Sequence, residues 1–207
     1  MEEIFPPGKT GTIRLKASML QSCFLRNDGN GKFTLIPLPN EAQISTINGM
    51  LADDFDGDGN LDVVVNGNDF GTEVSIGRYD AFNGLLLKGD GNGGFTPLSI
   101  QESGIFIPGN GRAAVKVRGS SGNYLVAVSQ HKNALKLFEL KRKIKTMPVN
   151  PSDISALIRF KNGKTEKREF YSGSSFLSQS SGFIPVNEVV SGITIFEKNG
   201  NKREIQY

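Results

Sequence analysis

Short apolar runs separated by Asn-Gly and Asp-Gly pairs dominate the hydrophobic pattern of the chain. The run LDVVV, residues 61–65, is rich in β-branched residues and predicts a buried strand. Residues 12–38 predict strand, turn and strand, because TIRLKASML, SCFLR and FTLIPL flank a tight-turn signal at Asn27–Gly31. Glycine accounts for 25 of the 207 residues, and helix-favouring runs are scarce. We therefore expect an all-β fold.

The last third of the chain predicts two more hairpins. Residues 155–171 turn at Asn162-Gly163, and residues 193–207 turn at Asn199-Gly200. Charge changes before them: residues 1–140 carry 12 Lys/Arg and 15 Asp/Glu, whereas residues 141–207 carry 12 and 6. This shift predicts a domain boundary near residue 141. The basic residues are spread among strands without interleaved aromatic residues, so we expect no nucleic-acid partner.

The first 140 residues contain an internal repeat. The segment LRNDGNGKFTLIPL, residues 25–38, is echoed by LKGDGNGGFTPLSI, residues 87–100, at an offset of 62 residues. The same offset places Val63-Val64-Val65 on Leu125-Val126-Ala127. Repeats of this length are typical of propellers and arrays, so residues 1–140 are expected to form repeated β-sheet blades. The longer stretch of residues 67–87 has no counterpart of equal length and predicts a projecting loop.

The most distinctive motif is DFDGDGNLD, residues 54–62. Unliganded carboxylates about 5 Å apart repel by roughly 3 kcal/mol per pair at an effective dielectric near 20, so this loop favours a cation. Hard oxygen donors without a nearby His or Cys select Ca²⁺ over transition metals. Gly59 is expected to have a positive φ. The alternative is an Asp/Gly turn that binds nothing. The predicted ligands are the carboxylates of Asp54, Asp56, Asp58 and Asp62 and the backbone carbonyl of Asn60.

The spacing differs from that of an EF-hand, in which Val65 would have to be a bidentate Glu. The loop is instead expected at the entrance of a strand. The second copy of the repeat lacks the motif, since the offset places non-acidic residues at all four carboxylate positions. This pattern suggests that fixed positive charge replaces the ion there. The substituting residues are Lys116, Arg118, Ser120 and Tyr124.

These residues resemble the FG-GAP/VCBS repeats, in which a D-x-D-x-DG-x-x-D calcium loop precedes a blade strand, as in integrin α-subunit propellers. The segment REFYSGSSFLSQSS, residues 168–181, resembles the ASPIC/UnbV domain that follows such repeats. The resemblance implies a β-propeller of about seven blades, of which residues 1–140 would supply two or three as a partial propeller. It implies a small all-β domain in residues 141–207. It also implies that the calcium ion stabilises the fold.

The expected function is a non-enzymatic, calcium-binding β-repeat module for adhesion, acting on a protein or glycan ligand outside the cell or at its surface. The N-terminus, MEEIFPPGKT, has no apolar core of a signal peptide, so the chain is expected to be either cytoplasmic or a piece of a longer exported chain, and the resemblance favours the second. The single Cys23 allows no intrachain disulfide, and no membrane span is expected. Oligomerisation or further N-terminal blades would cover the sheet edges that a partial propeller exposes.

Two other functions fit the same residues. A metal-dependent hydrolase could use the Asp loop, but all four acids would serve as ligands and leave no separate acid–base pair. The only histidine, His131, has no Ser or Cys nucleophile at a suggestive spacing. The other alternative is a scaffold whose blades assemble a larger complex. A spare carboxylate in a deep pocket would favour the hydrolase, and a large exposed apolar patch would favour the scaffold.

Overall fold

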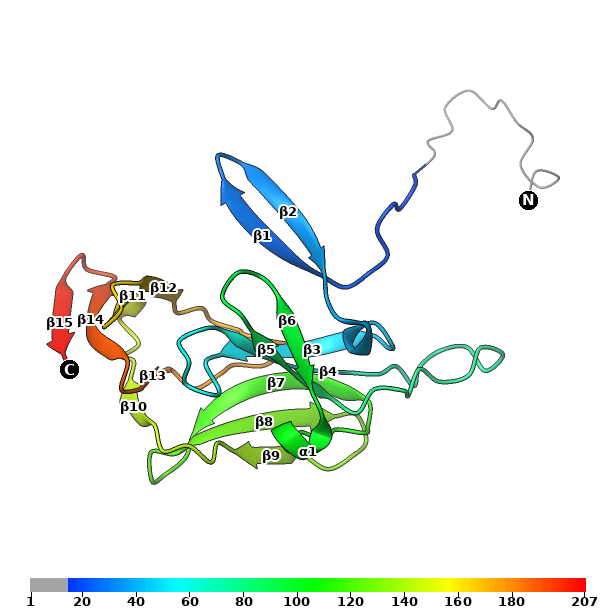
Figure 1. The fold of residues 1–207 in the computed structure, drawn as a ribbon. Coiled ribbons are helices and arrows are strands. Elements are labelled where there is room, and N and C mark those ends of the chain that lie inside the picture. Colours follow the sequence, from blue (N-terminus) through cyan, green and yellow to red (C-terminus); the bar gives the residue numbers. More distant parts are fainter. Residues whose placement is uncertain (1–14) are drawn as a thin grey trace.

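The computed structural model describes residues 15–207 and confirms an all-β fold built from several antiparallel sheets (Figure 1). None of the sheets that residues 15–207 form closes on itself. The helical elements among the described residues are η1 (Asn40–Ala42) and α1 (Ile100–Ser103), each a single turn. Within residues 15–207, no helix is long and apolar enough to cross a membrane.

The N-terminal hairpin pairs β1 (Cys23–Gly29) with β2 (Lys32–Pro37) as a separate two-stranded sheet. The predicted turn is confirmed, since Asn30 and Gly31 have φ angles of 51° and 73°. The strand predicted for residues 12–20 is wrong over residues 15–20, which form no regular element. Its first three residues lie outside the described part of the chain. The alternation of apolar and polar residues in this stretch does not stabilise a strand by itself, and no strand of the described residues pairs with it.

The internal repeat corresponds to two adjacent sheets. The 62-residue offset relates the first two strands of one sheet to the first two of the other, and it relates the N-terminal hairpin to the last two strands of the four-stranded sheet. The predicted buried strand is β4 (Asp62–Gly67). One sheet has the order β3 (Ile47–Asp53), β4 (Asp62–Gly67), β5 (Leu85–Gly89) and β6 (Phe95–Leu98). The other has the order β7 (Gly111–Arg118), β8 (Tyr124–Gln130) and β9 (Lys136–Glu139).

Strands β3 and β7 lie side by side, and Gly49 permits their close approach. A Cβ atom at this position would lie 2.5 Å from the backbone oxygen of Arg112, so only glycine fits. The neighbouring Asn48 donates from Nδ2 to the backbone oxygens of Asn68 and Gly111, each at 2.9 Å. These contacts join the two repeats at their first strands.

The predicted projecting loop follows β4 and extends away from the sheets (Figure 1). It is pinned near its base by a bridge between Asp69 and Tyr79, and Val74 at its tip is fully exposed. The guanidinium of Arg78 lies 5.1 Å from the centre of the Phe70 ring. This contact braces the loop.

The C-terminal part forms two further sheets, and its hairpins are confirmed. Their turns contain Gly163 and Gly200, with φ angles of 83° and 85°. The smaller sheet pairs β10 (Lys145–Pro148) with β13 (Phe183–Val186). The larger has the order β12 (Thr165–Glu169), β11 (Asp153–Phe160), β14 (Val190–Glu197) and β15 (Lys202–Gln206).

Hydrophobic packing crosses the predicted boundary at residue 141. The C-terminal sheets have a core of their own, centred on Ile158, Ile193 and Ile195. However, Phe183 packs into the core of the two repeat sheets, with its ring centre 5.2 Å from that of Tyr124. The C-terminal part therefore completes a core that the repeat sheets begin.

The serine-rich segment, residues 172–181, lies along the edge of β7. Two of its hydroxyl oxygens accept backbone hydrogen bonds, Ser175 from Ala114 at 3.3 Å and Ser180 from Lys116 at 3.2 Å. Ser181 donates its backbone N–H to the Lys116 carbonyl at 2.8 Å. Because residues 114 and 116 are alternate positions of an edge strand, these contacts take the place of a neighbouring strand.

Candidate metal centre

The Asp loop connects β3 to β4, where the sequence predicted a strand entrance. Asp53, the last residue of β3, pairs with Asp62, the first residue of β4, so the loop is a hairpin connection. Gly57 and Gly59 have φ angles of 91° and 86°. The positive φ predicted for Gly59 is thus confirmed, and it lets the chain turn back within a few residues.

Three carboxylates converge in this loop. One oxygen from each of Asp54, Asp56 and Asp58 lies within 4.8 Å of the other two. Backbone N–H groups of the loop orient them: Asp58 donates to Asp56 Oδ1 at 3.0 Å, and Asn60 donates to Asp58 Oδ1 at 2.8 Å. The arrangement is an oxygen-only cluster of the kind that hard cations prefer.

The fourth predicted carboxylate has different neighbours. Asp62 is buried, and its two oxygens accept backbone hydrogen bonds from Phe55 and Gly89, both at 3.0 Å. It therefore ties the loop to the end of β5. Burial raises the pKa of both Asp62 and Asp54 above their ordinary values.

Two basic side chains lie against the cluster. Lys88 Nζ contacts Asp56 Oδ2 and lies 3.3 Å from Asp58 Oδ2. Burial raises the pKa of Asp56, but the hydrogen bonds from Lys88 and the Asp58 backbone, together with the charges of Lys88 and Arg142, outweigh burial and lower the pKa overall. Arg142 lies 3.9 Å from Asp54 Oδ1. These cations reduce the repulsion among the acids, although the exposed lysine does so in strongly screening solvent.

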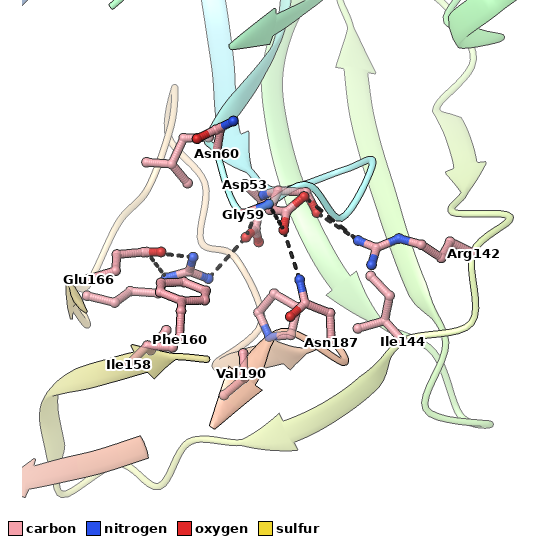
Figure 2. A pocket seen from close by; sticks show the side chains of 14 residues that line it. Asp53, Gly59, Asn60, Arg142, Ile144, Ile158, Phe160, Glu166, Asn187 and Val190 are labelled. Carbon is pink, nitrogen blue, oxygen red and sulfur yellow. Dashed lines mark hydrogen bonds and ion pairs between the residues drawn. The ribbon is translucent and has the colours of Figure 1, made fainter. Parts of the chain in front are cut away.

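The C-terminal part reaches the same loop (Figure 2). Asn187 donates from Nδ2 to Asp54 Oδ2 at 2.9 Å, and Arg142 donates to the backbone oxygen of Asp54 at 3.2 Å. The side-chain oxygen of Asn187 is buried without a hydrogen-bond partner. A cavity of about 20 Å³, enough for about one water molecule, lies between the loop and the C-terminal strands.

Asp53 is a buried acid that sequence reasoning overlooked. It is fully buried, and its oxygens contact Lys116 Nζ at 3.0 Å, Tyr124 OH at 3.0 Å and Arg168 Nη1 at 3.1 Å. Burial raises the pKa of Asp53, but the charges of Arg168 and Lys116 and the hydrogen bonds from Lys116 and Tyr124 together outweigh burial and lower the pKa overall. Glu166 in turn binds Arg168 at 2.7 Å. The carboxylate of Asp53 thus links both repeat sheets to β12.

The sequence did contain a signal for this network. The repeat offset identified Lys116 and Tyr124 as replacements for acids of the first loop. The expectation that positive charge replaces the ion within the second copy is wrong, because Lys116 binds Asp53 of the first repeat sheet. Arg118 donates to Thr146 Oγ1 at 2.7 Å instead. The two basic residues therefore stabilise contacts between segments.

Comparison with known proteins adds no family assignment. No protein-family model matches the chain, and no curated protein is significantly similar to it. The resemblance to FG-GAP/VCBS repeats and the ASPIC/UnbV domain stays a prediction.

Proposed function

We propose that this chain is a calcium-binding β-repeat module without enzymatic activity. The single observation that carries the proposal is the convergence of the Asp54, Asp56 and Asp58 carboxylates in one glycine-containing loop. The proposed setting is extracellular or at the cell surface, with a protein or glycan ligand, as in adhesion modules. The resemblance to FG-GAP/VCBS propeller blades followed by an ASPIC/UnbV-like domain supports this setting.

The donor chemistry around the loop fits calcium. Oxygen is the only donor type in the cluster of Asp54, Asp56 and Asp58 carboxylates. Asn187 donates its Nδ2 to Asp54, and its side-chain oxygen has no hydrogen-bond partner among the described residues. Each oxygen of Asp62 accepts one backbone hydrogen bond, which orients the loop, and keeps a second lone pair with which it would bind the ion. The residues proposed to hold the ion are Asp54, Asp56, Asp58, Asn60 through its carbonyl, and Asp62.

The proposed role of the ion is to stabilise the fold. Bound calcium would bring two positive charges into direct contact with all three carboxylates, whereas Lys88 contacts Asp56 and Asp58 and Arg142 lies 3.9 Å from Asp54. At a free concentration about 100-fold above the dissociation constant, a ligand specific to the native state adds about 2.7 kcal/mol to stability. This is a large fraction of the free energy of unfolding of a typical folded domain, which is about 5–15 kcal/mol.

Thermal unfolding in EDTA, followed by CaCl₂ and MgCl₂ titrations, tests the proposal. We expect the melting temperature to rise with Ca²⁺ and scarcely with Mg²⁺, because Mg²⁺ retains its water and demands tighter octahedral geometry. The Asp56→Ala variant should lose the calcium response. The matched control is Asp90→Ala, which removes an acid from another Asp-Gly turn. The Asp90 carboxylate accepts hydrogen bonds from the backbone N–H groups of Asn92 and Gly94. An equal calcium response in wild type and Asp56→Ala would refute the proposal.

A further inference from the structure

The N-terminal hairpin corresponds to the outer half of a four-stranded sheet. By the 62-residue offset, Cys23–Leu25 of β1 match Leu85–Leu87 of β5, and Phe33 of β2 matches Phe95 of β6. Both pairs are antiparallel, so the two hairpins are structural copies. Among the residues that the structure describes, only the second copy belongs to a larger sheet.

The two copies differ at one edge. The side of β5 away from β6 pairs with β4, through Val63 opposite Leu87 and Val65 opposite Leu85. Within residues 15–207, β1 pairs with β2 alone, so its corresponding edge is free (Figure 1). Leu87 is 1% exposed, whereas its counterpart Leu25 is 55% exposed.

One face of the hairpin is correspondingly apolar and uncovered. Leu25 lies opposite Leu35, and Phe33 lies two residues from Leu35 on the same face. All three are exposed, at 50–57%. The other face is anchored, since Phe24 packs edge-to-face on Phe95 at 5.6 Å between ring centres. The hairpin therefore has a fixed position and presents the open face to solvent.

A second position repeats the same contrast. In the complete sheet, Phe82 from the loop before β5 is 3% exposed and packs with Leu87 and Val65. The offset places Leu20 at the equivalent position before β1, and Leu20 is 88% exposed. Leu20 thus lacks the valine surface against which its counterpart packs.

We propose that the free edge of β1 binds a strand pair of the β3–β4 type, supplied by a partner polypeptide, and so completes a four-stranded sheet. The added strand would continue the antiparallel ladder that β1 and β2 already form, and it would repeat the β4–β5 contact within this chain. Its side chains next to Leu25 are β-branched and apolar, as Val63 and Val65 are beside β5. The proposal is independent of metal binding.

The test supplies such a strand pair directly. Residues 47–67 are fused ahead of Met1 through a short Gly/Ser linker. The linker raises the local concentration of the added strand pair to roughly the millimolar range. The experiment runs in EDTA to exclude a contribution from metal. We expect backbone amides of Cys23–Leu25 to exchange with deuterium about tenfold more slowly than in the unfused protein. Unchanged exchange in the fused protein would overturn the proposal.

Two variants of the fused protein identify the surface. Leu25→Lys should abolish the added protection, because it places a charge in the new apolar contact. Leu135→Lys, which changes a leucine that is 60% exposed outside the hairpin, should retain it. Sedimentation of the unfused protein over a concentration series tests whether a second copy of the chain binds the edge of β1 instead. Self-association with protection of the same amides would assign the edge to a second copy and overturn the choice of partner.

Discussion

Asp53 binds three side chains from distant parts of the chain. It binds Lys116, Tyr124 and Arg168, which follow it by 63, 71 and 115 residues. Because it is fully buried, its charge depends on these partners rather than on water. Removing one partner of a buried ion pair leaves a charge without compensation, which is usually costly.

We predict that Arg168→Ala lowers the free energy of unfolding by about 3–5 kcal/mol, because Asp53 loses a guanidinium that contacts it directly. Urea denaturation measures the change. The control is Lys167→Ala, which removes a neighbouring but exposed ion pair with Glu169 and should cost less than about 1 kcal/mol. Equal losses in the two variants would show that the Asp53 network contributes little to stability.

Sequence reasoning at this scale reached the residues of the loop and missed their surroundings. Asp54, Asp56 and Asp58 could be grouped because alternate positions in a short turn bring their carboxylates together. Asp53 lies outside this alternation, and no pattern in the sequence assigned it a role. Its role depends on Arg168, and no local pattern links two residues so far apart in the chain.

At the scale of elements, the edge of β7 depends on serine hydroxyls. The Ser180 hydroxyl oxygen accepts from the Lys116 N–H, a donor that would otherwise lack a strand partner. We predict that Ser180→Ala speeds hydrogen exchange of the Lys116 amide about fivefold, equivalent to about 1 kcal/mol for a net hydrogen bond. Exchange measured by mass spectrometry or NMR tests this.

Ser178→Ala is the matched control for the serine contact. The Ser178 hydroxyl is buried without a hydrogen-bond partner, so its loss should leave exchange of the Lys116 amide unchanged. If both variants increase exchange equally, the segment protects β7 by covering it and not through the Ser180 hydroxyl.

Turns and hairpins were predictable because their signals are local. Asn-Gly pairs set the positive φ angles at Gly31, Gly163 and Gly200, and the flanking apolar alternation defined the strands. The course of the serine-rich segment was not predictable in this way. Hydroxyls that bond backbone in a turn look the same in sequence as hydroxyls that complete the edge of a distant strand.

At the scale of the whole molecule, the charge shift at residue 141 separates two segments that share a core. Phe183 is 2% exposed and packs with the repeat sheets, and Asp53 and the serine-rich segment add polar contacts across the same boundary. Shared burial of this kind couples unfolding. The composition of the chain showed where the charge changes, but not that the two parts pack together.

We therefore predict that calorimetry of the intact chain shows one unfolding transition. Phe183→Ala should lower its stability by about 3–5 kcal/mol, because a buried aromatic ring leaves a cavity between the repeat sheets and β13. The control is Phe176→Ala in the same part of the chain, where the ring is 49% exposed and the expected loss is much smaller. Two separate transitions in the wild type, with Phe183→Ala shifting only one, would mean that the segments unfold independently. The contacts across residue 141 would then hold the two parts in place without making them one cooperative unit.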